Sequence, residues 1–75
     1  MKKYKNLSGK STVTSFELAK DSVKVRFADQ SVYLYSNQAT GMANVSQMKI
    51  LAGEGKGLGT FIETKVKDCF ARKVR

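Results

Sequence analysis

Alternating apolar and polar residues in the first half of the chain predict three β-strands. Residues 23–27 alternate strictly between apolar and basic side chains, which is typical of a half-buried strand. Residues 11–18 are rich in Thr, Val and Phe, and residues 32–35 are apolar and aromatic, so we expect strands there as well. The connections are too short for crossovers, and the three strands should therefore form an antiparallel meander.

Apolar residues in the second half recur at helical spacing and predict two helices. The first is expected near residues 44–52 and the second over residues 61–73. Between them, the glycine-rich stretch 53–59 should prevent the first helix from continuing. The expected fold class is α+β, with a three-stranded antiparallel meander followed by two helices packed on one face of the sheet, in the order β-β-β-α-α.

Positive charge is concentrated at the two ends of the chain, which has a net charge of +8. Residues 1–10 carry four lysines and no acid, whereas basic and acidic residues balance over 11–64. We expect residues 1–10 to be a flexible basic tail and residues 11–75 to form a single domain. Basic ends on a neutral body suit a polyanion such as nucleic acid, although such ends also serve solubility alone.

The residue types that most catalytic and metal sites require are scarce. The chain has no histidine and one cysteine, Cys69, so neither an intramolecular disulfide nor a zinc site is expected. Cys69 lies on the apolar stripe of the predicted last helix, where a buried, structural thiol is expected. The carboxylates are scattered, and we therefore predict a non-enzymatic protein with no catalytic residue, metal or cofactor.

No apolar run approaches the roughly 20 residues of a membrane span, and no apolar segment of a signal peptide follows the basic N-terminus. Together with the lone cysteine, these features predict a cytoplasmic protein with no membrane partner. A chain of 75 residues buries a modest core, so we expect a monomer or a weak homo-oligomer.

The strand register decides which face of the sheet Tyr33 and Tyr35 occupy. With a two-residue turn, they share an open face with Lys24 and Arg26, an arrangement typical of surfaces that bind single-stranded nucleic acid. With a three-residue loop, Val25 pairs with Tyr35 and both tyrosines turn toward the helices. Asp-Gln is a poor pair for the short turn, which favours the longer loop without excluding the other.

The same stretch carries a resemblance to a known family. An alternating strand that ends in Phe27, then Tyr33-x-Tyr35, a short helix, the turn 55–58 and Ile62 together resemble the short KTSC-type domain over residues 12–67. Such domains occur at the C-terminus of some lysyl-tRNA synthetases and alone in small bacterial proteins. The resemblance implies a similar layout, and RNA binding has been suggested for the family.

The remaining basic residues complete the candidate site. Lys56 lies within the glycine-rich stretch, whose backbone N–H groups would hold a phosphate if the stretch is not simply a flexible turn. The predicted nucleic-acid-binding residues are Lys24, Arg26, Tyr33, Tyr35, Lys56, Lys65, Arg72 and Lys73.

We expect the partner to be RNA or another single strand. The alternatives are a protein-interaction or regulatory module with an acidic protein partner, and a small metal-independent ribonuclease toxin that uses Lys24, Arg26, Tyr33 and Tyr35.

Overall fold

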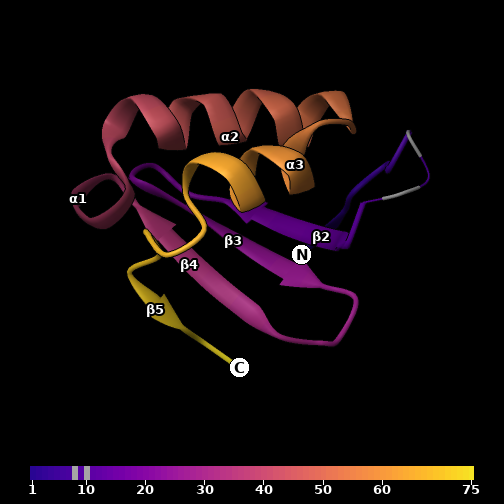
Figure 1. Ribbon diagram of the computed structural model, residues 1–75, viewed down its shortest axis with the longest axis horizontal. Coiled ribbons are helices and arrows are strands. Elements are labelled where there is room, and N and C mark those ends of the chain that lie inside the picture. The colour runs from indigo at the N-terminus through magenta and orange to yellow at the C-terminus, as the bar shows by residue number, and fades with distance from the viewer. Residues whose placement is uncertain (8, 10) are drawn as a thin grey trace.

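The computed structural model describes residues 1–7, 9 and 11–75, which form an antiparallel sheet with helices on one side (Figure 1). The strands lie in sequence order across the sheet: β1 (Lys2–Lys3), β2 (Val13–Leu18), β3 (Ser22–Phe27), β4 (Val32–Ser36) and β5 (Arg72–Lys73). The helices are α1 (Asn37–Thr40), α2 (Met42–Glu54) and α3 (Leu58–Lys65). The α+β class is confirmed, but the sheet has five strands instead of three, because short strands are added at both edges.

The helices α2 and α3 lie on the same side of the sheet, so they cover one of its faces and leave the other uncovered (Figure 1). Strand pairing and burial define a covered face, whose residues include Phe16, Val23, Val25, Tyr33 and Tyr35. The opposite, open face consists of Lys3, Ser15, Glu17, Lys24, Arg26, Val32, Leu34 and Arg72.

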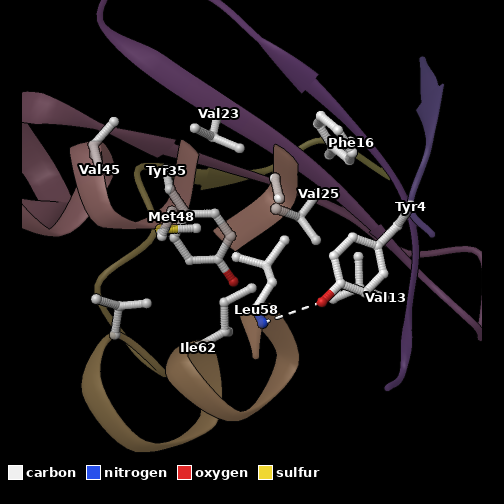
Figure 2. Packing of buried hydrophobic residues seen from close by; sticks show 12 residues of the cluster. Tyr4, Val13, Phe16, Val23, Val25, Tyr35, Val45, Met48, Leu58 and Ile62 are labelled. Atoms are coloured by element: carbon white, nitrogen blue, oxygen red, sulfur yellow. Dashed lines mark hydrogen bonds between the residues drawn. The ribbon is translucent and has the colours of Figure 1, made fainter. Parts of the chain in front are cut away.

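The core lies between the covered face and the helices (Figure 2). Val45, Met48 and Ala52 recur at helical spacing along α2 and are buried there. Helix α3 contributes Leu58 and Ile62, which are also buried. Among the described residues, no helix is long and apolar enough to cross a membrane.

The β3–β4 hairpin settles the direction of the tyrosines. Its loop has three residues, 28–30, and Gln30 adopts the left-handed conformation with φ of 74°, as in a type I turn that closes with a bulge. The longer loop and the inward tyrosines are therefore confirmed. The predicted pairing was wrong by two residues, because Val25 lies opposite Tyr33 and not opposite Tyr35.

The N-terminal segment belongs to the fold, contrary to the expected flexible tail over residues 1–10. Strand β1 pairs with β2, and Tyr4 is only 2% exposed, with its ring edge against Phe16. The Tyr4 hydroxyl accepts a hydrogen bond of 3.2 Å from the backbone N–H of Leu58 (Figure 2). The part of the predicted tail at Ser8 and Lys10 lies outside the described residues.

The helix predicted near residues 44–52 is confirmed as α2 and is longer than expected. It continues through Gly53 and ends where Gly55 takes a left-handed φ of 81°, a common helix C-cap. Gly59 lies within α3 and is buried. The expectation that the 53–59 stretch would prevent the first helix from continuing is confirmed, although Gly53 and Gly59 themselves lie within helices, where a single glycine is tolerated when packing compensates.

The helix predicted over residues 61–73 is wrong in its second half. Helix α3 ends at Lys65, and the chain then turns back so that β5 pairs with β4. Phe70 is half-buried and packs edge-on against Tyr33 and Tyr35, with its ring centroid 4.8 Å from that of Tyr33. Cys69 is exposed, so the predicted buried thiol is also wrong. Pairing with β4, which would otherwise be an edge strand, outweighs the local helical spacing.

Candidate functional site

The open face gathers basic side chains from three strands. They are Lys3 of β1, Lys24 and Arg26 of β3, and Arg72 of β5. Cross-strand partners form two neighbouring rows, which are Lys3–Ser15–Arg26–Val32 and Glu17–Lys24–Leu34–Arg72. Glu17 is the acidic member of this face. The open face therefore presents four cations against one carboxylate, in a regular array with the spacing of a sheet.

Arg26 holds the central position in this array. It lies on β3 between Ser15 of β2 and Val32 of β4, and its side chain is half-buried. Its Nε atom is buried and has no hydrogen-bond partner among the residues that the structure describes. A buried guanidinium nitrogen without an acceptor is costly, so one hydrogen bond of Arg26 is left unmade among the described residues.

Tyr33 and Tyr35 do not join this array, because they lie on the covered face. Tyr35 is buried, and its burial, with a smaller effect from Tyr33, raises the pKa of its phenol to about 12. The predicted platform of Lys24 and Arg26 with two tyrosines is therefore not formed. The residues proposed for a ribonuclease toxin are the same set, and they fall on opposite faces of the sheet.

The other predicted basic residues are dispersed. Lys56 is exposed in the loop between α2 and α3, and Lys65 is the last residue of α3. Arg72 and Lys73 are consecutive in a strand, so Arg72 lies on the open face and Lys73 on the covered side, with its Nζ 5.8 Å from the centroid of the Tyr33 ring. The helix predicted over residues 61–73 would have carried Lys65, Arg72 and Lys73 together. That prediction is wrong, because Arg72 and Lys73 lie in β5.

One of the backbone N–H groups that begin α3 after the glycine-rich turn is already occupied and is not free for a phosphate. The N–H of Leu58, the first residue of α3, donates to the Tyr4 hydroxyl inside the core. A Cβ at Gly59 would lie 2.7 Å from the Oγ of Ser11, so this side of the helix is already covered. Close packing thus explains the glycine at position 59, and the two contacts together weaken the phosphate interpretation.

A groove that the sequence did not predict opens at the end of the β3–β4 hairpin, between the covered face and α3. It has a volume of about 620 Å³. Its aromatic and apolar lining comes from Phe27, Tyr33, Tyr35, Ile62 and Phe70, and its polar lining from Thr12, Asp29, Ser31, Glu63, Lys67 and Asp68. We call it the aromatic groove. Sequence patterns could not place it, because Phe70 reaches it only through the reversal of the chain after α3.

Within the described part of the chain, no three histidine, cysteine, aspartate or glutamate side chains gather in an arrangement that could hold a metal ion. The prediction of a non-enzymatic protein stays a prediction. No family model, curated protein or solved structure matches the chain. The resemblance to the KTSC-type domain likewise stays a prediction.

Proposed function

We propose that this protein is a non-enzymatic module that binds nucleic acid through phosphate contacts on the open face. We expect it to bind RNA or single strands in preference to duplex DNA. The observation that carries the proposal is the array of Lys3, Lys24, Arg26 and Arg72 on one side of a sheet whose other side is occupied by helices. Phosphate contacts supply most of the affinity in binding that does not depend on sequence.

The residue types on the open face favour contacts to phosphates over contacts to bases. Aromatic rings, which stack on bases, are confined to the covered side among the described residues of the sheet, so base stacking is not expected on the open face. Arg26, at the centre of the array, is the expected anchor, since a guanidinium binds phosphate oxygens in a fork. Little discrimination between base sequences should result.

The proposal is tested with two triple variants of equal net charge. Lys24→Gln, Arg26→Gln and Arg72→Gln remove cations from the open face, whereas Lys49→Gln, Lys56→Gln and Lys65→Gln remove three from the helical side. Fluorescence anisotropy with a labelled single-stranded RNA of mixed sequence measures affinity over a series of salt concentrations, and far-UV circular dichroism confirms that each variant is folded.

Each single-strand phosphate contact contributes about −0.7 to the slope of log K against log salt. Loss of three contacts in the open-face variant should therefore flatten the slope by about 2, with little change in the helical-side variant. Equal losses in both variants would assign binding to net charge and not to the open face. Absence of binding by the wild-type protein at about 50 mM salt, where such attraction is strong, would reject the proposal and favour an acidic protein partner for the same cations.

A further inference from the structure

The aromatic groove has a charge opposite to that of the protein as a whole. The chain has 14 basic and six acidic residues, yet the groove is lined by three of the acids and by one lysine. The acids are Asp29 from the hairpin loop, Glu63 from α3 and Asp68 from the segment after α3, and the lysine is Lys67. Three separate segments therefore bring carboxylates to one groove in a protein with a net charge of +8.

The apolar part of the groove is a cluster of aromatic rings. The centroids of Phe27 and Tyr33 are 5.7 Å apart and those of Tyr33 and Phe70 are 4.8 Å apart, both pairs in edge-to-face geometry. In such a pair the edge of one ring points at the face of the other, so the faces of the edge-on ring are not covered by its partner. The faces of aromatic rings attract cations.

A cation already lies against this cluster. The Nζ of Lys73 is 5.8 Å from the centroid of Tyr33, within the range of a cation–π contact. One of the carboxylates is also held in place, because Asp29 Oδ1 accepts hydrogen bonds from the backbone N–H and the hydroxyl of Ser31. These bonds, and to a lesser extent the charge of Lys73, hold the pKa of Asp29 below its usual value, so this carboxylate is ionised at neutral pH.

We propose that the aromatic groove seats an arginine side chain from a basic segment of a partner protein. A guanidinium stacks on aromatic faces and binds carboxylates through paired hydrogen bonds, whereas a phosphate would meet three negative charges against the single positive charge of Lys67. The groove volume of about 620 Å³ lies within the roughly 300–1,000 Å³ of ligand sites in proteins and leaves room for the residues beside the arginine.

This site is independent of the nucleic-acid proposal, since it lies on the covered side of the sheet. The experiment titrates the full-length protein with a capped tripeptide, Gly-Arg-Gly, while amide shifts are followed by NMR. The matched control peptide contains citrulline, which has the shape of arginine without its charge. A nucleoside monophosphate serves as the third ligand and tests whether a base occupies the groove.

The arginine peptide should shift the amides of Asp29, Tyr33, Glu63 and Phe70 and should bind at least about tenfold more tightly than the citrulline peptide, a ratio that corresponds to about 1.4 kcal/mol. Tighter binding of the nucleotide, equal binding of the two peptides, or no shifts at millimolar peptide would each overturn the proposal.

Three variants assign the charges that carry the binding. The double variant Glu63→Gln and Asp68→Asn should weaken arginine-peptide binding by about tenfold, because two exposed carboxylates of the groove are lost. The control Glu17→Gln removes an acid from the open face and should leave binding unchanged. Lys73→Ala should strengthen binding, since it removes the cation that competes for Tyr33. Weaker binding by Lys73→Ala would show that Lys73 helps to form the site and would contradict the proposed competition.

Discussion

The hydrogen bond between Tyr4 and Leu58 provides a sharp test of whether the N-terminal segment stabilises the fold. The hydroxyl of Tyr4 accepts the N–H that begins α3, and both residues are buried. Tyr4→Phe keeps the ring and leaves that N–H without its partner, which costs about 1–3 kcal/mol in a buried environment. Tyr4→Ala also empties the space of the ring and should cost about 3–5 kcal/mol, enough to unfold a marginal domain.

Urea denaturation followed by far-UV circular dichroism measures both changes. In a domain of this size, each kcal/mol corresponds to a shift of about 4–8 °C in Tm, so thermal melts supply a second readout. Lys2→Ala is the matched control, because this neighbouring side chain is exposed and its loss should change the free energy of unfolding by no more than about 0.5 kcal/mol. A deletion of residues 1–4 is measured in the same way. If Tyr4→Phe and this deletion change the free energy of unfolding no more than Lys2→Ala does, Tyr4 does not anchor α3 and the N-terminal segment is a dispensable tail.

Further predictions concern the glycines, Tyr35 and Cys69. Gly53→Ala should raise the free energy of unfolding by about 1 kcal/mol, because alanine is the better helix former and nothing lies within 4 Å of the added Cβ. Gly55→Ala should lower it by more than about 1 kcal/mol, since φ is +81° and the new Cβ would lie 2.6 Å from the Cβ of Lys5; urea melts of the two variants should move in opposite directions. The pKa of Tyr35 is raised to about 12 in the folded protein, so folding favours the neutral phenol. The stabilisation from this neutral phenol is complete below about pH 10. The free energy of unfolding should therefore decline by up to roughly 2–3 kcal/mol as the pH rises to 12. Tyr35→Phe should lose that decline in urea melts compared over the same pH range, and an unchanged profile would contradict a buried neutral phenol. Cys69 should react with a thiol reagent in the native protein, and Cys69→Ser should change the free energy of unfolding by less than about 0.5 kcal/mol; reaction only after unfolding would place the thiol inside.

The sequence predicted the central meander well because alternation directly reports a half-covered strand. Residues 23–27 lie in β3 as expected, and poor turn chemistry at Asp29-Gln30 pointed to the longer loop that turns the tyrosines toward the helices. The exact pairing was missed, because it depends on the left-handed conformation of Gln30, which no propensity rule favours for glutamine.

The chain ends were predicted poorly because tertiary contacts decide their structure. Tyr4 lies among lysines in sequence, but its neighbours in space come from β2 and α3. Residues 66–74 have apolar spacing compatible with a helix, yet Phe70 meets two tyrosines across the sheet and the N–H of Ala71 donates to Leu34 in β4. Local periodicity cannot anticipate such contacts between distant segments.

The candidate site in the structure differs from the predicted one because it, too, depends on contacts between distant segments. Lys24 and Arg26 were placed together by simple alternation and remain together, but their proposed aromatic partners lie on the other face. Arg72 joins them only because β5 exists. The aromatic groove needed both the hairpin loop and the reversal after α3, and the alternation of Lys3 and Lys5 about Tyr4 was the one local signal of a strand at the N-terminus.

Strand β5 separates the two proposed surfaces by a single residue. Arg72 pairs with Leu34 on the open face, whereas the next residue, Lys73, pairs with Tyr33 and lies against its ring. Arg72→Gln and Lys73→Gln remove the same charge from adjacent positions, so long-range electrostatics should change almost equally in the two variants. Contacts at the surfaces should differ, because neighbouring side chains of a strand point to opposite faces.

Arg72→Gln should therefore flatten the salt dependence of RNA binding by about 0.7 and leave arginine-peptide binding unchanged. Lys73→Gln should do the reverse, with tighter peptide binding and a salt slope within about 0.3 of the wild-type value. Anisotropy and NMR titrations of both single variants, each checked for an intact fold, decide the matter. If both variants lost the same RNA affinity and neither altered peptide binding, charge near the C-terminus would act as one diffuse patch, and the division of binding between two faces of the sheet would be wrong.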